Sequence, residues 1–274
     1  MKDYKEEYYE QSILWDCNFL EIPAEEERLE KIIKIIPSDV QTILDVGCGN
    51  GVFVNTLTDI FPGRFDRIVG VDSSKEALKF VKVEKYGANI SSLPFTNKSY
   101  DLLTSLEVLE HLSQEDFKKG ILELQRVAKK YIIITVPNEE DLEHSLVICP
   151  KCNCWFHPSF HVRSFDSSVL NNMFNNYKLI NIKEIGPVIE YRLYPSLLYS
   201  FYRNWRKILP PKTSICPKCG FQHREIFMDI DSPKVSNYFL LKSIFLFIKS
   251  LGKLFYPLKR KRRWLLALYE KKCR

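Results

Sequence analysis

The stretch TILDVGCGNGVF, residues 42–53, constrains the fold of this chain more than any other. Apolar residues lead to Asp45, Gly47, Gly49 and Gly51 follow, and a helical pattern resumes with FVNTLTDIF. A glycine-rich turn between a strand and a helix lets the backbone approach a ligand closely and points helix N–H groups at it. The stretch therefore predicts a strand, a turn and a helix, with a ligand site at the turn.

Further apolar runs repeat this alternation. RIVGVD ends in Asp72, and Ser73 or Ser74 can cap a helix over KEALKFVKVEKYG. YDLLTSL and KYIIITVPN predict two strands separated by the helical stretch SQEDFKKGILELQRVAKK, and KLINIKEIG and WLLALYEKK predict two more strands. Near-continuous apolar strands that alternate with helices predict an α/β fold with a parallel, doubly wound sheet.

The glycine turn alone does not identify its ligand. Asp72 stands 21 residues after Gly51, at the end of the next strand, where a carboxylate can accept hydrogen bonds from both hydroxyls of a ribose. A dinucleotide-binding enzyme would have the same spacing, and glycines can also serve only a tight turn.

Four motifs in order resemble the class I S-adenosylmethionine-dependent methyltransferases, of the type 11 group. ILDVGCGNG is similar to their first motif, VGVDSSKEAL to their second, and ANISSLPFTNKSYDLLTSLEVLEHL to their third and fourth. The resemblance is dense over residues 38–137. It implies a Rossmann-like, seven-stranded sheet whose last strand runs antiparallel, with S-adenosylmethionine over the carboxyl ends of the first two strands.

The resemblance also assigns the cofactor-binding positions. The methionine pocket would be shaped by Asp45, Gly47, Gly49 and Gly51. The ribose would be bound by Asp72, and the adenine would be contacted by Asn89 and Ile90. Many relatives have Asp at the position of Asn89. The Asn carbonyl can still accept a bond from the adenine amino group.

The segment SLEVLEHL places three chemically active side chains after an expected strand. Glu107, Glu110 and His111 would share a face if the turn that follows is helical, because residues three and four apart are neighbours on a helix. One interpretation is a charged helix start, which the helix dipole favours. A second is general-base catalysis, in which His111 or Glu107 takes a proton from a substrate hydroxyl.

A third interpretation is a divalent metal site. The pattern E-x-x-E-H resembles the metal-binding segment of the small-RNA 2′-O-methyltransferases and of the ubiquinone-pathway O-methyltransferases. In the RNA group another His follows the fifth strand, and FHVRSF places His161 in a similar context. Glu107, Glu110, His111 and His161 would then hold Mg²⁺, Mn²⁺ or Zn²⁺, which could orient a substrate hydroxyl and lower its pKa.

Two identical CPKC turns predict a structural zinc. Cys149, Cys152, Cys216 and Cys219 have the spacing of paired knuckles that give four thiolates to a tetrahedral Zn²⁺. The fold that the resemblance implies would have both turns leave the active-site edge of the sheet, so a shared zinc would join them into a lid over the acceptor pocket. We expect the nearby Cys154, His157 and His223 not to be ligands.

These predictions divide the chain into six segments. Leu29, Ile32, Ile33 and Ile36 share one face of a helix over EEERLEKIIKII, which Pro37 ends. The segments are an N-terminal helical cap (1–37), the cofactor-binding core (38–138), a first zinc-knuckle insertion (139–163), a core helix and strand (164–187), a second zinc-knuckle and basic amphipathic insertion (188–262) and a final strand (263–274).

Charge is distributed unevenly along the chain. Residues 1–150 hold 17 Lys and Arg against 27 Asp and Glu, whereas residues 151–274 hold 23 against 7. The basic, aromatic stretch from Asn237 to Arg263 has an unbroken apolar run of only five residues, Ile244–Ile248, which is too short to cross a bilayer. It can be a helix packed on the core, a helix on an anionic membrane surface, or a nucleic-acid contact.

The reaction we expect is O-methylation, because an oxygen acceptor needs a proton sink such as a His beside two carboxylates. The preferred acceptor is a sugar hydroxyl in a lipid-linked or polysaccharide precursor; the alternatives are RNA 2′-O-methylation and a non-catalytic, zinc-dependent binding module with a relic cofactor pocket. The charged N-terminus MKDYKEEYYEQ lacks an apolar signal region, so we expect a cytoplasmic protein, peripheral on the inner membrane face if the basic helix binds lipid.

Overall fold

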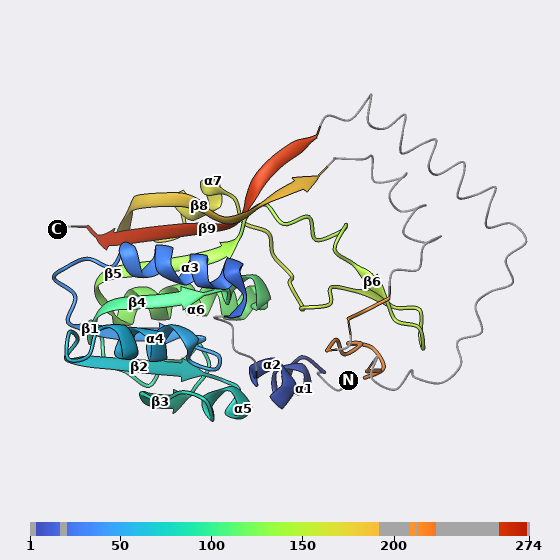
Figure 1. Cartoon of the computed structure of the whole chain (residues 1–274), viewed down its shortest axis with the longest axis horizontal. Coiled ribbons are helices and arrows are strands. Elements are labelled where there is room, and N and C mark those ends of the chain that lie inside the picture. Colours follow the sequence, from blue (N-terminus) through green and yellow to red (C-terminus); the bar gives the residue numbers. More distant parts are fainter. Residues whose placement is uncertain (1–3, 17–20, 192–208, 212, 223–257, 273–274) are drawn as a thin grey trace, which may run out of the picture.

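The fold is a seven-stranded sheet covered by helices on both faces (Figure 1). The computed structural model describes residues 4–16, 21–191, 209–211, 213–222 and 258–272. The strand order is β3-β2-β1-β4-β5-β9-β8. β9 runs antiparallel to both of its neighbours, β5 and β8. The strands are β1 (Thr42–Val46), β2 (Arg67–Asp72), β3 (Glu84–Gly87), β4 (Tyr100–Leu106), β5 (Ala128–Pro137), β8 (Tyr177–Tyr191) and β9 (Lys259–Lys271). The predicted sheet with an antiparallel last strand is confirmed.

Helices connect these strands, and a two-stranded ribbon lies apart from the sheet. Pro23 occupies the first turn of the third helix, and Ser113 caps the sixth by accepting a bond from the N–H of Asp116. The helices are α1 (Tyr4–Tyr9), α2 (Ser12–Trp15), α3 (Pro23–Lys34), α4 (Val52–Ile60), α5 (Lys75–Leu78), α6 (Gln114–Val127) and α7 (Ser167–Asn171), with a 3₁₀ turn η2 (Leu109–His111); the ribbon is β6 (Val147–Ile148) and β7 (Trp155–Phe156).

Two hydrophobic layers hold the sheet between its helices. Successive strand residues point to opposite faces, so Ile43 packs with α3 and α4, whereas the adjacent Leu44 packs with α6 and α7. Both are fully buried. This double burial explains the near-continuous apolar strands of the sequence, and it leaves the carboxyl ends of the strands as the place for polar chemistry.

Two predicted boundaries were wrong. The helix expected over KEALKFVKVEKYG ends at Leu78, and Glu84–Gly87 instead form the edge strand β3 by pairing with β2; tertiary pairing overrides the local helical preference. The last strand begins at Lys259 and not at residue 263, because β8 extends to Tyr191 and pairs with it there. The run KRKRR is therefore part of β9.

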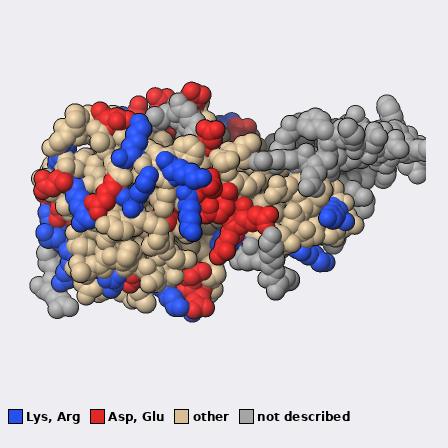
Figure 2. All heavy atoms as spheres, turned by 90° about the horizontal axis from the view of Figure 1, so that it is seen from below, with Lys and Arg blue, Asp and Glu red and all other residues tan. Residues whose placement is uncertain are grey.

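The expected basic helix falls largely outside the described residues. Within the part of the chain that the structure describes, no helix is both long and apolar enough to pass through a bilayer. Figure 2 shows basic and acidic side chains interspersed over one face, with acidic side chains gathered near its middle. The described basic side chains therefore do not form one continuous surface on that face.

Candidate active site and cysteine cluster

The glycine turn joins β1 to α4 in a conformation with no room for side chains. Gly47 has a φ of 79°, and a Cβ there would lie 2.3 Å from the side chain of Val108. The N–H groups of Gly47 and Cys48 donate to the carbonyl of Val71 at 2.7 and 2.9 Å. The turn is thus fixed against the end of β2, and Gly51, also left-handed, is the N-cap of α4.

Two carboxylates stand at the ends of β1 and β2 beside this turn. Asp72 accepts bonds from the N–H groups of Gly49 and Ser74, both at 2.8 Å, and Asp45 accepts one from the hydroxyl of Thr104 at 2.6 Å. Burial raises the pKa of both groups, that of Asp45 to about 7. A ligand that brings positive charge or hydroxyl donors would therefore be favoured here.

The two residues assigned to the adenine follow β3. Ile90 is buried, and a Cβ added to Gly120 would lie 3.2 Å from it. The side-chain oxygen of Asn89 accepts bonds from both the N–H and the hydroxyl of Ser91 at 2.9 Å. An adenine amino group would have to compete with Ser91 for this oxygen.

Glu107 follows β4 directly and has a left-handed φ of 58°. A non-glycine residue in this region is strained by about 1–3 kcal/mol, and such strain is common at active sites. The next regular turn is the 3₁₀ turn η2, and α6 begins only at Gln114. Glu110 and His111 therefore lie in this 3₁₀ turn and not in the first turn of α6.

Glu110 is a deeply buried carboxylate, with 1% of its side-chain surface exposed. Neither carboxylate oxygen has a hydrogen-bond partner, and Oε1 lies 3.8 Å from Nε2 of His111. Ligand atoms of Glu110, His111 and His161 all lie within 4.8 Å of one another. The structure thus brings together three of the four expected metal ligands; Glu107 lies outside this group, toward Thr135 and Arg28.

Burial governs the electrostatics of the cluster. It raises the pKa of Glu107, and with the charge of Glu107 it raises that of Glu110 well above its usual range. Burial and the neighbouring His161 hold the pKa of His111 well below its usual range. The charged forms of Glu107, Glu110 and His111 are disfavoured here. A divalent cation would favour the ionised carboxylates by adding positive charge.

Comparison with known proteins agrees with this arrangement. The family model described as "Methyltransferase domain" matches residues 44–134. This chain carries a methyltransferase domain. The domain spans the glycine turn, Asp72, Asn89 and the Glu107–His111 segment, and its cofactor is S-adenosylmethionine.

The chain covers very different shares of the proteins to which it is similar. The chain is 27% identical over 173 residues to an uncharacterised protein of Methanocaldococcus jannaschii, across 61% of this chain and 68% of that protein. It is 31% identical over 145 residues to a small RNA 2′-O-methyltransferase of Arabidopsis thaliana, across 46% of this chain but only 15% of that protein.

One solved structure shows the same fold over the full length. A chain of the complex between the Haloferax volcanii Trm112 methyltransferase activator and a methyltransferase superposes with a TM-score of 0.55 at 14% identity, covering 100% of both chains. At this identity the likeness concerns the fold alone.

An N-terminal segment, residues 4–16, packs across the site of the methyltransferase domain. The hydroxyl of Tyr9 lies 2.8 Å from Nδ1 of His111, and the Tyr9 carbonyl accepts a bond from Ser74 at 2.9 Å. The ring of Trp15 would lie 2.9 Å from a Cβ on Gly49. No motif in YKEEYYEQ indicates this position, because the contacts join residues about 35 to 100 apart in sequence.

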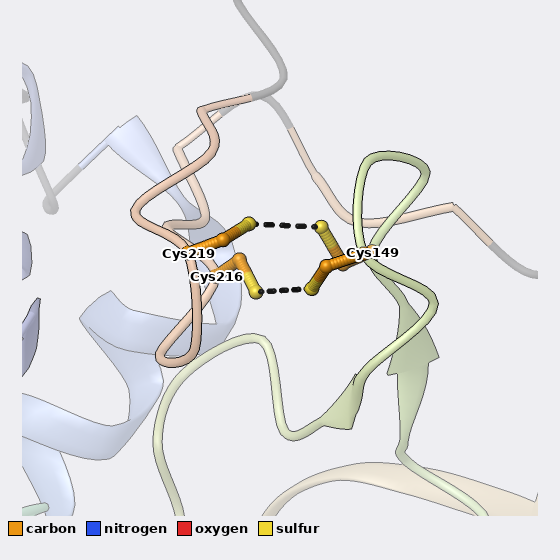
Figure 3. Close-up of side chains that lie close together, drawn as sticks. Cys149, Cys216 and Cys219 are labelled. Carbon is orange, nitrogen blue, oxygen red and sulfur yellow. Dashed lines mark hydrogen bonds between the residues drawn. The ribbon is translucent and has the colours of Figure 1, made fainter.

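The four knuckle cysteines meet beside the domain, as expected. Figure 3 shows their sulfurs pointing toward one another from two separate loops. Cys149 and Cys219 sulfurs are 3.7 Å apart, and those of Cys152 and Cys216 are 3.6 Å apart. Tetrahedral zinc with Zn–S bonds of about 2.3 Å would place sulfurs about 3.8 Å apart. The described cysteines form no disulfide.

The two knuckles share one backbone geometry. In each, the N–H of the first cysteine donates to the carbonyl five residues later, to Cys154 and Phe221, both at 2.9 Å. In each, the residue four positions after the first cysteine is left-handed, Asn153 with φ 56° and Gly220 with φ 69°. This repeated hairpin fits a shared structural metal.

The neighbours of the knuckles have other roles. The thiol of Cys154 donates to the Trp155 carbonyl at 3.4 Å and lies outside the four-sulfur group. His157 turns toward Glu140 at 3.3 Å, which the sequence did not indicate. His223 lies outside the described residues.

Proposed function

We propose that this protein transfers the methyl group of S-adenosylmethionine to a hydroxyl oxygen, and that the acceptor is a ribose 2′-hydroxyl of RNA. Glu107, Glu110, His111 and His161 form the acceptor end of the site. Asp45, Asp72 and the glycine turn form the cofactor end. The two ends meet because β1, β2 and β4 are neighbours whose carboxyl ends share one edge of the sheet.

One observation carries the proposal: the buried Glu110 carboxylate has no hydrogen-bond partner but lies within reach of two imidazoles. A buried unpaired carboxylate is costly, so it requires a proton or a cation. Two His and a carboxylate suit a divalent ion such as Mn²⁺ or Zn²⁺. A bound cation would supply Lewis acidity, lowering the pKa of the acceptor hydroxyl.

The chain's own residues supply alignment and a proton sink. The sulfonium methyl is already activated, so the site must chiefly hold nucleophile, methyl and sulfur in line. Glu107, beside Arg28 and Thr135, is placed to take the hydroxyl proton, directly or through water. Glu107 directly follows the end of β4 and has a left-handed backbone there.

RNA is favoured as acceptor by the relative named as a small RNA 2′-O-methyltransferase. The four-cysteine module would bind structural Zn²⁺ and hold the first insertion, with His161, over the acceptor end. The sugar-precursor expectation rests on diols that would suit a metal and on a basic helix that would suit a lipid; that helix lies largely outside the described residues.

The test is methyl transfer from labelled S-adenosylmethionine to matched RNA and DNA oligonucleotides, after chelation and with Mn²⁺ restored. Metal-dependent labelling of RNA and not of DNA is expected. Transfer to lipid-linked or free glycans without RNA labelling would instead establish the sugar acceptor. Binding of the cofactor without transfer to any hydroxyl acceptor would contradict the proposal and support a non-catalytic binding module.

A further inference from the structure

Glu140 lies just beyond β5, and its two carboxylate oxygens engage two different imidazoles. Its Oε2 is 2.5 Å from Nδ1 of His161, and its Oε1 is 3.3 Å from Nε2 of His157. The Glu140 and His161 side chains are 20% and 14% exposed, and that of His157 is 7% exposed. The rings of His157 and His161 stack on each other with centroids 4.5 Å apart. The largely buried Glu140 carboxylate contacts a nitrogen of each ring.

Backbone hydrogen bonds fix the direction of this chain of contacts. Nδ1 of His157 accepts bonds from the N–H groups of Ser159 and His161, at 3.3 and 3.2 Å. A nitrogen that accepts carries no proton, so the proton of neutral His157 is on Nε2 and is donated to Glu140. The other oxygen of Glu140 is then free to accept from Nδ1–H of His161.

This geometry sets the state of His161. With its proton held at Nδ1 by Glu140, the lone pair of His161 is on Nε2, the one ring nitrogen left to face Glu110 and His111. The ring of His111 is oriented by the Tyr9 hydroxyl, which lies 2.8 Å from its Nδ1, and its Nε2 faces Glu110. Both rings therefore present Nε2 to the same space.

We propose that Glu140 is the positioning residue of the acceptor-end cluster: it fixes the tautomer and orientation of His161, and His157 anchors it to the cysteine module. The inference rests on the cation site proposed above. A ligand His whose other N–H is held by a carboxylate is a recurring arrangement around metals, and loss of the carboxylate costs about 10–100-fold in metal affinity.

The same residues do not suit a separate metal site. Ligand atoms of Glu140, His157 and His161 also lie within 4.8 Å of one another. A cation among them would have to displace the proton from Nε2 of His157, whose Nδ1 is already occupied by two backbone donors. It would also take His161 away from Glu110. One cation, held at the Glu110 end, is expected.

The coupling to the cysteine module is short in sequence and in space. His157 follows β7 directly, and β7 is the strand that leaves the first knuckle. The path from the module to the cluster is His157, Glu140 and His161. Holding the two cysteine hairpins in place therefore holds a metal ligand in place.

The test measures Mn²⁺ binding to the zinc-loaded full chain by electron paramagnetic resonance of free Mn²⁺. Glu140→Gln should bind Mn²⁺ about 10–100-fold more weakly than the wild type, since one amide oxygen cannot accept from both His157 and His161. The matched control is the neighbouring exposed Glu139→Gln, which should bind as the wild type does. Equal weakening in both variants, no weakening in Glu140→Gln, or two bound Mn²⁺ per chain would overturn the proposal.

A second readout does not need the metal. Nitrogen-15 NMR of the metal-free protein should show His161 protonated at Nδ1 and His157 at Nε2, with the His161 pattern altered in Glu140→Gln. If the wild type binds no Mn²⁺, the cation site of the proposed function fails, and this NMR result still decides the role of Glu140. An unaltered His161 pattern would overturn that role.

Discussion

At the scale of single residues, the candidate site consists of side chains that are costly to bury. Glu110 has no hydrogen-bond partner, Glu107 has a left-handed backbone and Asp45 is a buried acid. Each lowers the stability of the fold taken alone, and each lies at the carboxyl edge of the sheet. Costs concentrated at one edge are typical of a site shaped for a ligand.

Gly47 offers a test of how tightly the cofactor turn is packed. Gly47→Ala should lower the free energy of unfolding by about 1–2 kcal/mol for the left-handed backbone, plus about 1–3 kcal/mol for the contact with Val108. Gly63→Ala is the matched control, because Gly63 has a φ of 74° but nothing within 4 Å of an added Cβ. Urea denaturation measures both, and equal losses would show that the contact with Val108 carries no cost.

Asp45 predicts a pH dependence of cofactor binding. Its pKa is raised to about 7, because burial and the nearby Asp72 raise it by more than the bond from Thr104 and the charge of Arg28 lower it. A cationic cofactor prefers the ionised form, so its affinity should rise with pH up to about 7 and level off above. The free protein should show the opposite linkage: a group with a raised pKa stabilises the fold at low pH, and this contribution is lost as pH rises through 7.

Calorimetry of S-adenosylmethionine binding between about pH 5.5 and about pH 8.5, a range centred on that pKa, measures this dependence. Asp45→Asn is the control, because an amide cannot ionise but can still accept from Thr104. Its affinity should be lower and nearly level across the range. A wild-type affinity that does not change with pH would assign the charge preference to another group.

At the scale of elements, the sequence predicted every strand of the main sheet except β3, and most of the helices, but not every contact between them. Apolar runs in the sequence coincide with β1, β2, β4 and β5. The period and length of such a run are local properties, so these strands could be predicted from the sequence. The edge strand β3 was missed because all four of its residues are exposed and only its pairing with β2 makes it a strand. A pairing partner is not a local signal.

The residues of the candidate site also fall into two groups: those that the sequence identified and those that it did not. Motif residues such as Asp72 and Glu107 were identified because a spacing along the chain marks them. Tyr9 and Glu140 were not, because they reach the centre through long-range packing of the N-terminal segment and the first insertion. His157 was considered only as a neighbour of the cysteines, since nothing in CNCWFH shows that its ring turns toward Glu140.

The paired knuckles give an element-scale prediction. Cys149→Ser should remove zinc, loosen the hairpins around β6 and β7 and expose residues 139–163 to protease, while the sheet stays folded. Cys154→Ser is the matched control, because its thiol lies outside the four-sulfur group. Elemental analysis and limited proteolysis measure both effects. Loss of zinc from both variants, or from neither, would contradict a zinc site made by the four knuckle cysteines.

At the scale of the whole molecule, charge separates along the chain while the fold brings the two halves together. The described basic run of β9 pairs with β8 on one side. On its other side it contacts the residues that follow β5. The Asn138 N–H donates to the Arg263 carbonyl at 2.9 Å, and the Lys261 side chain donates to the Glu139 carbonyl. The basic strand thus borders the acceptor end. A phosphate backbone that delivers a ribose hydroxyl to Glu107 would pass this strand.

Alternating strand residues separate two sets of charges on β9. Lys259, Lys261 and Arg263 share one face, which is the face that reaches Glu139, whereas Arg260 lies on the other and pairs with Glu190 at 2.8 Å.

Lys259→Gln should therefore weaken RNA binding and reduce the slope of log affinity against log salt by about 0.7, the value for one lost contact to a single-stranded phosphate. S-adenosylmethionine affinity should not change. Arg260→Gln should leave the salt slope as in the wild type, because that charge is already paired. Fluorescence anisotropy of a labelled oligonucleotide over a salt series measures both variants, and identical slopes for Lys259→Gln and the wild type would place the RNA path elsewhere on the molecule.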